Sequence, residues 1–131
     1  TNPPPNLACR CFTHSTETIL WARKNDKKSR HFFNYQKMKE MNGGKQMKDV
    51  WTGSLTKPSE KTEGKHPTQK PEYLLERIVL ASTEEGQVIL DPFCGSGTTG
   101  VEAVRFGRKF IGIDVNEEYM EISKKRLEKV L

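Results

Sequence analysis

Residues 88–100 read Val88-Ile89-Leu90-Asp91-Pro92-Phe93-Cys94-Gly95-Ser96-Gly97-Thr98-Thr99-Gly100. In this stretch an apolar strand, an acid, a glycine loop and a helix start follow one another. Glycines let the backbone approach a ligand where any Cβ would collide, and Ser and Thr are favoured where a helix begins. The stretch therefore predicts a small-molecule cofactor site between a strand and a helix.

A second apolar strand, residues 109–113, ends on Asp114. The distance from Gly97 to this acid is near that at which a βαβ unit brings a carboxylate back to the ribose of a bound nucleotide. Asp114 is therefore predicted to bind ribose hydroxyls. The same position also suits a cap for the helix predicted from Asn116 onward.

The spacing of the three glycines also fits a nicotinamide or flavin dinucleotide. However, residues 91–94 separate the strand from the first glycine, whereas a dinucleotide fold turns almost directly from strand into glycines. The carboxylate of Asp91 would repel a pyrophosphate and attract an ammonium or a sulfonium. S-adenosyl-L-methionine (AdoMet) carries both cations and a ribose. We therefore predict AdoMet as the cofactor, with a dinucleotide oxidoreductase domain as the alternative.

Several motifs in order resemble those of DNA amino-methyltransferases of the N6-adenine and N4-cytosine type. Residues 90–99 look like their AdoMet-binding motif. Residues 65–71, Lys-His-Pro-Thr-Gln-Lys-Pro, resemble the motif that precedes the AdoMet loop in the β-ordered class of these enzymes. Residues 110–114 are similar to the next motif, and residues 17–22 resemble a strand of a family β-hairpin. The resemblance is close over 65–131 and loose before it, and it identifies a C-terminal, AdoMet-binding portion.

The resemblance also implies roles for single residues. Asp91 would lie near the methionine end of AdoMet, while the motif of Thr68 and Lys70 would reach the methionine carboxylate. His66 would shape that motif's loop or serve only as a hydrogen-bonded structural group, and Phe93 would line the adenine or close the core. The predicted cofactor-binding residues are His66, Thr68, Lys70, Asp91, Phe93, Gly95, Ser96, Gly97, Thr98, Thr99 and Asp114.

Methylation of an exocyclic amine needs groups that hold the amine, because its lone pair is delocalised into the base. The family resembled here uses an acidic or Ser residue, two prolines and an aromatic that stacks on the flipped base. Only Asn2-Pro3-Pro4-Pro5 comes close, and its last position has no flat π face. We therefore predict no catalytic residue in this chain, and expect it to need the missing N-terminal part of a larger methyltransferase.

The composition is compatible with a DNA partner. The 131 residues amount to about one domain, and the net charge of +5 favours a polyanion. Four lysines lie where the family places target recognition, and they would either contact DNA phosphates or remain solvated: Lys37, Lys39, Lys45 and Lys48. The three cysteines form no metal-like pair, so no metal site is predicted. No membrane span or secretory leader is seen, and we expect a cytoplasmic location.

The predicted fold class is α/β: a partial Rossmann-like AdoMet-dependent methyltransferase fold with a parallel βαβ core and an antiparallel β-hairpin. Residues 1–35 would supply the hairpin, with a strand at 18–22 paired to one at 30–35. Residues 36–64 would form a loop or insertion, possibly for target recognition. Residues 65–131 would alternate helix, strand, helix, strand and helix. The predicted function is site-specific DNA methylation at adenine N6, or at cytosine N4, in a restriction-modification system. An inactive DNA-binding or partner module is the remaining alternative.

Overall fold

The computed structural model describes residues 7, 10–24 and 30–131. Its elements in chain order are α1 (Tyr35–Met41), the short 3-10 helix η1 (Pro58–Glu60), α2 (Glu72–Ser82), β1 (Val88–Asp91), α3 (Thr98–Arg105), β2 (Lys109–Gly112) and α4 (Glu117–Glu128). From α2 onward the elements alternate as helix, strand, helix, strand and helix. This is the order that the sequence predicts for residues 65–131.

The two strands form a parallel pair connected by α3, which is a βαβ unit. Val88 is opposite Lys109, and Leu90 is opposite Ile111. Backbone bonds prolong the pairing beyond the strands, since the Ile113 N–H donates to the Asp91 carbonyl at 2.9 Å. The predicted parallel α/β core is confirmed. Its geometry brings the carboxyl ends of both strands to the same edge of the sheet.

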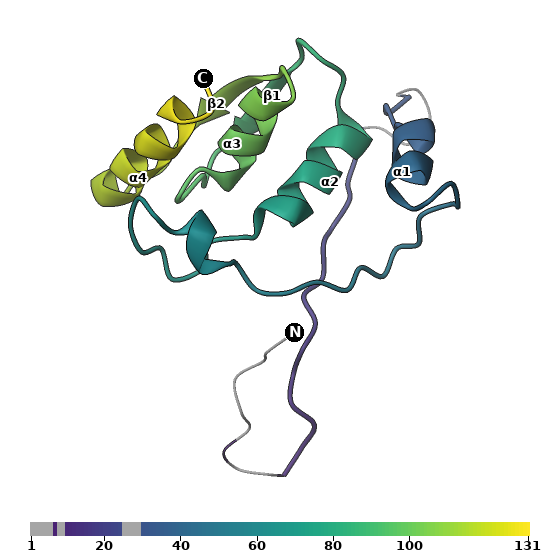
Figure 1. Cartoon of the computed structure of the whole chain (residues 1–131), viewed down its shortest axis with the longest axis horizontal. Coiled ribbons are helices and arrows are strands. Elements are labelled where there is room, and N and C mark those ends of the chain that lie inside the picture. The colour runs from purple at the N-terminus through teal and green to yellow at the C-terminus, as the bar shows by residue number, and fades with distance from the viewer. Residues whose placement is uncertain (1–6, 8–9, 25–29) are drawn as a thin grey trace.

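Helices α2 and α3 pack together, and α3 lies against both strands (Figure 1). Their buried apolar side chains include Val79 and Val101. Phe110 of β2 points toward α3, because a Cβ built on Gly100 would lie 2.5 Å from its ring. The absence of a side chain at Gly100 therefore allows α3 to approach the sheet closely.

The opposite face of the sheet is apolar but open. Alternate strand residues share a face, and on this face Leu90 is 59% and Ile111 is 52% exposed. Val88 and Ile113 on the same face are also more than half exposed. In the described part of the chain, no element covers these four side chains. Parallel sheets are almost always covered on both faces. This face therefore has the character of an interface.

The predicted antiparallel hairpin is not formed as paired strands. Residues 18–22 and 30–34 are described and contain no strand, and Tyr35 is the first residue of α1. The two segments still meet through side chains, since the Trp21 ring lies 5.2 Å from His31 and 5.5 Å from Phe33 between centroids. Alternating apolar residues favour a strand, but a strand also needs a neighbour for its backbone bonds. Residues 25–29, which connect the two segments, lie outside the described residues.

The middle segment is more ordered than the loop predicted for 36–64. Helix α1 extends into it as far as Met41, and η1 lies near its end. Asn34 caps α1 by accepting from the Lys37 N–H at 3.1 Å, and Met38 is buried. One cap and one buried side chain thus hold a helix too short to show a clear hydrophobic period. Among the described residues, no helix has the length and apolar character needed to span a bilayer.

Candidate functional site

The glycine loop joins β1 to α3 and is enclosed from two sides. Gly95 and Gly97 have φ of +51° and +74°, a left-handed conformation that favours glycine. A Cβ on Gly95 would lie 2.8 Å from Nε2 of His66, and one on Gly97 would lie 2.1 Å from Oγ of Ser123. The loop is therefore confined between the His66 segment and α4, with no room for larger residues.

Asp114 connects the end of β2 to this loop. Its Oδ2 accepts the N–H of Gly95 at 2.8 Å, and its Oδ1 accepts the N–H of Asn116 at 2.9 Å. These two backbone bonds, Asn116 first, lower the pKa of Asp114 below its ordinary value. The carboxylate is thus ionised at neutral pH. Each oxygen retains a further lone pair for a ligand hydroxyl. Asn116 itself caps α4, by accepting from the Tyr119 N–H at 3.1 Å.

Asp91 occupies the equivalent position at the end of β1. Its Oδ2 accepts from Oγ1 of Thr99 at 2.6 Å, and its Oδ1 accepts from the Phe93 N–H at 3.1 Å. Thr99 therefore orients the carboxylate from the first turn of α3. The Phe93 side chain is exposed, so it does not close the core. Two carboxylates therefore lie at the ends of paired strands next to the glycine loop.

The 65–71 segment lies beside the loop, since His66 approaches Gly95 and the Lys70 carbonyl accepts from the Thr98 hydroxyl. The His66 ring packs against Tyr119 with 4.1 Å between centroids, and its Nδ1 accepts from the Thr68 N–H at 3.3 Å. Burial lowers the pKa of His66, while the charge of Asp114 opposes that shift. The imidazole is therefore mainly neutral at neutral pH. Lys70 Nζ forms an ion pair with Glu17 at 2.6 Å.

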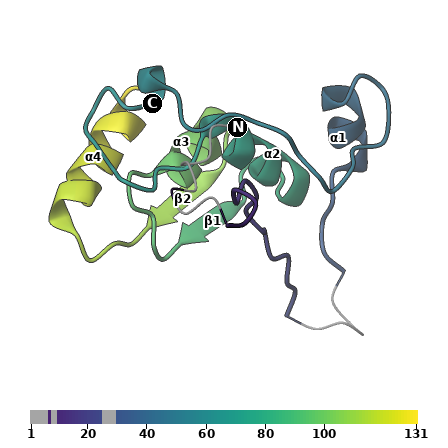
Figure 2. The same cartoon turned by 90° about the horizontal axis from the view of Figure 1, so that it is seen from below.

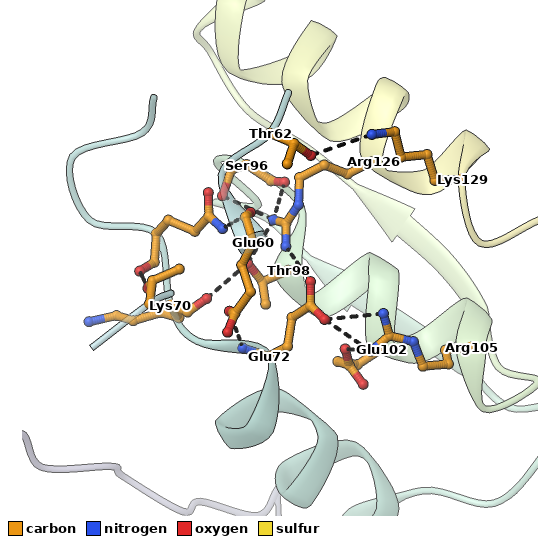
Figure 3. Close-up of polar contacts among 12 residues, drawn as sticks. Glu60, Thr62, Lys70, Glu72, Ser96, Thr98, Glu102, Arg105, Arg126 and Lys129 are labelled. Atoms are coloured by element: carbon orange, nitrogen blue, oxygen red, sulfur yellow. Dashed lines mark hydrogen bonds and ion pairs between the residues drawn. The ribbon is translucent and has the colours of Figure 1, made fainter. Parts of the chain in front are cut away.

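The side chains of Ser96 and Thr98 are directed toward the protein interior, where they face Arg126 of α4. Both are buried, and Nη1 of Arg126 donates to the Ser96 carbonyl at 2.8 Å and to the Thr98 hydroxyl at 2.9 Å (Figure 3). Arg126 was not predicted from the sequence, because its charge near the end of α4 matched an ordinary interaction with the helix dipole. The available signal was the spacing of Met120, Ser123 and Arg126 on one face of α4.

Cys94, inside the loop, is buried and its Sγ lies 3.6 Å from the sulfur of Met120. Burial raises the pKa of the Cys94 thiol, and the charges of Asp91 and Asp114 raise it further. The thiol is therefore protonated at neutral pH. No group of His, Cys, Asp and Glu suited to a metal ion occurs among the residues that the structure describes.

The four predicted DNA-contacting lysines are not brought to the glycine loop. Lys37 and Lys39 belong to α1, and Lys45 and Lys48 follow it. Figures 1 and 2 both place α1 and α4 at opposite ends of the helical layer. Lys37 lies 3.9 Å from Glu40 in an exposed ion pair. These lysines therefore form a region separate from the carboxylates.

Comparisons with known proteins agree with the motifs. A DNA methylase family model of the N6 and N4 type matches residues 1–125. The type II methyltransferase M2.LlaDCHI of Lactococcus lactis subsp. cremoris is 78% identical over 129 residues, which cover 98% of this chain and 48% of that protein. M2.DpnII of Streptococcus pneumoniae is 77% identical over 128 residues, with the same two coverages. The chain thus spans about half the length of these relatives.

A solved structure agrees as well. The crystal structure of the M1.HpyAVI–SAM complex is 34% identical, with a TM-score of 0.58, and the match covers 77% of this chain and 46% of that one. The family to which these matches point uses S-adenosyl-L-methionine as its cofactor. Since the family model matches nearly all of the sequence, and the described βαβ unit has the predicted order, this chain belongs to the N6/N4 DNA methylase family.

Proposed function

We propose that the chain is the AdoMet-binding part of a site-specific DNA methyltransferase that modifies the exocyclic amine of adenine, or that of cytosine. One observation carries the proposal: the ionised Asp114 and the Thr99-oriented Asp91 lie at neighbouring strand ends beside a loop of left-handed glycines. This arrangement suits a cationic nucleoside and disfavours a pyrophosphate, because two carboxylates would repel the phosphates.

Different residues of the site would contact different parts of the cofactor. Asp114 would accept from the ribose hydroxyls with its remaining lone pairs, and Asp91 would lie toward the cationic methionine end. Gly95 and Gly97 would allow close backbone approach, and the exposed Phe93 could cover the adenine ring. Bound AdoMet would supply the electrophilic methyl group. Ser96 and Thr98 would support the loop from within, since their oxygens already accept from Arg126.

We propose that the remaining part of the enzyme holds the target amine and packs on the open face of the sheet. Leu90 and Ile111 are more exposed than a stable parallel sheet normally allows. The relatives are about twice as long as this chain, so they contain enough additional sequence for another layer. The Asn2-Pro3-Pro4-Pro5 segment lies outside the described residues.

The lysines at and after α1 would contact DNA phosphates at a distance from the cofactor. A separate basic region fits a substrate that extends over many base pairs. The names of the matched relatives, type II methyltransferases, support a role in restriction-modification. A cytoplasmic location would place the enzyme with its DNA.

Calorimetry with AdoMet and a radiolabelled methyl-transfer assay would test this proposal. The chain alone should bind AdoMet and transfer no methyl group. Co-expression with the portion of M2.LlaDCHI that this chain does not match should restore transfer to duplex DNA. Tight binding of NAD in place of AdoMet would refute the cofactor assignment. Turnover by the chain alone would refute the division of labour.

A further inference from the structure

One face of α4 lies behind the glycine loop and contacts it through Met120, Ser123 and Arg126. The sulfur of Met120 is 3.6 Å from Cys94 Sγ, and Ser123 lies where a side chain on Gly97 would be. Arg126, three residues further on, reaches the last part of the loop. Residues three apart share a helix face. Helix α4 therefore supports the loop at Cys94, Ser96 and Gly97.

The guanidinium of Arg126 provides the polar part of this support. The residue is only 6% exposed. Its Nη1 donates to the Ser96 carbonyl at 2.8 Å, the Thr98 hydroxyl at 2.9 Å and the Ser96 hydroxyl at 3.3 Å. The hydroxyl of Thr98 in turn donates to the Lys70 carbonyl at 3.1 Å. Arg126 thus connects α4 to the glycine loop directly, and to the 65–71 segment through Thr98.

Glu72 compensates the charge of this buried guanidinium and fixes its orientation. Nη2 of Arg126 lies 3.1 Å from Oε1 of Glu72, at the start of α2, while Oε2 of Glu72 pairs with Arg105 of α3. The Glu72 N–H donates to Glu60 at 2.9 Å (Figure 3). A buried guanidinium without a partner would be strongly unfavourable. With Glu72 held from α3 and η1, Nη1 is directed at the loop.

We infer that Arg126 is a positioning residue for the cofactor loop: it fixes the inner side of residues 94–98, so that their outer side keeps the shape that AdoMet needs. The inference rests on the proposed function, because it assigns the loop to AdoMet. It goes beyond that function in naming a residue on another element that does not contact the ligand. A pair that only stabilised the fold would join helices; Arg126 also donates to the backbone of the loop itself.

Arg126→Met and Arg126→Lys test the inference, with Lys125→Met as the matched control. Lys125 is exposed, adjacent in sequence and equal in charge. Amide hydrogen exchange of the full chain without cofactor should show residues 94–99 exchanging at least about tenfold faster in Arg126→Met, with α2 protected as in the wild type. Arg126→Lys keeps the charge but cannot bridge the loop and Glu72 at once, so it should show a smaller acceleration. Lys125→Met should show none.

AdoMet binding by calorimetry provides the second measurement. The affinity should fall about tenfold in Arg126→Met, less in Arg126→Lys and not at all in Lys125→Met. Wild-type exchange rates at residues 94–99 in both Arg126 variants would overturn the inference, as would faster exchange with unchanged affinity. If Arg126→Met does not fold, Arg126→Lys alone decides between these outcomes. If the wild type binds no AdoMet, the proposed function fails, whereas the exchange data still decide whether Arg126 holds the loop.

Discussion

Asp114, just beyond β2, accepts the backbone N–H of Gly95, in the loop after β1, at 2.8 Å. This bond crosses between the carboxyl ends of the two parallel strands. It makes one residue both a candidate ligand for ribose and a structural support of the loop. The position of Asp114 at the end of a strand therefore suits both roles, and a substitution there would affect both.

Asp114→Ala should weaken AdoMet binding at least about tenfold, because it removes charge-assisted bonds worth about 1.5–3 kcal/mol each. Asp114→Asn keeps one carbonyl acceptor, so its AdoMet affinity should fall less than that of Asp114→Ala. Titration calorimetry measures both affinities, and near-UV circular dichroism controls for folding. Equal affinity in a folded Asp114→Ala variant would contradict the assignment. Since the folded pKa of Asp114 is lowered, its contribution to stability should be present above its ordinary pKa and lost as the pH falls through the lowered value.

Gly97→Ala should destabilise the chain by about 2–4 kcal/mol, because it combines a left-handed backbone with a side chain placed on Ser123. Gly43→Ala is the matched control. Gly43 has a similar φ of +64° but no atom within 4 Å of its added Cβ, so it should cost only about 1–2 kcal/mol. Urea denaturation measures both. Equal losses would show that the loop and α4 are not in close contact at Gly97.

Glu102→Gln should flatten the pH dependence of stability between about pH 5 and pH 8. Glu102 is 0% exposed, and burial raises its pKa from 4.5 to about 7, with Arg105 opposing and Glu72 and Glu76 adding to the shift. Between these values the folded state binds more protons than the unfolded state, so the unfolding free energy falls as pH rises, by at most about 3 kcal/mol.

Urea denaturation at pH 5.5 and pH 8 would measure the change in unfolding free energy between these two pH values, for the wild type and for Glu102→Gln. The amide in Glu102→Gln can still accept from Arg105 without bringing a charge into the core. Glu121→Gln, at an exposed position of α4, serves as the control and should leave the difference unchanged. A wild-type stability that does not decline over this range would refute the prediction.

Lys70→Ala should weaken AdoMet binding more than DNA binding if its ammonium exchanges Glu17 for the cofactor carboxylate. Glu17→Gln is the informative partner, since it removes the exposed pair at 2.6 Å and leaves Lys70 available. An exposed pair contributes at most about 1 kcal/mol, so neither variant should unfold the chain. Calorimetry should show weaker AdoMet binding only in Lys70→Ala. Identical behaviour of the two variants would mean that Lys70 serves the Glu17 pair alone.

Neutralising Lys37, Lys39, Lys45 and Lys48 together should weaken DNA binding and leave AdoMet affinity unchanged. For every lysine that touches a phosphate, its neutralisation should reduce the slope of log affinity against log salt by about one unit. Fluorescence anisotropy at several salt concentrations measures this slope in the complete enzyme. Neutralising Lys124 and Lys125 of α4, compared with neutralising Lys37 and Lys39 alone, provides the control at equal net charge. An unchanged slope in the quadruple variant would identify the lysines as solvated surface.

Local patterns were sufficient to predict the βαβ unit. Apolar strands, the glycine loop and the Asn116 cap act over a few residues, so the sequence alone indicates where β1, α3, β2 and α4 lie. Parallel pairing then places Asp91 and Asp114 at one edge without further information. The family followed from the same ordered motifs. The residues that these local rules misjudged were those whose conformation depends on a distant neighbour.

Tertiary structure alone decided the burial of Arg126, the support of the glycine loop by α4 and the pairing of Lys70 with Glu17. It also decided that residues 18–22 do not form a strand in this chain. A strand and a buried cation share one requirement, since each needs partners that are remote in sequence. The hydrophobic period and the capping residues reflect interactions between residues three or four positions apart in the sequence. They therefore predict elements, while the packed fold determines which polar groups meet.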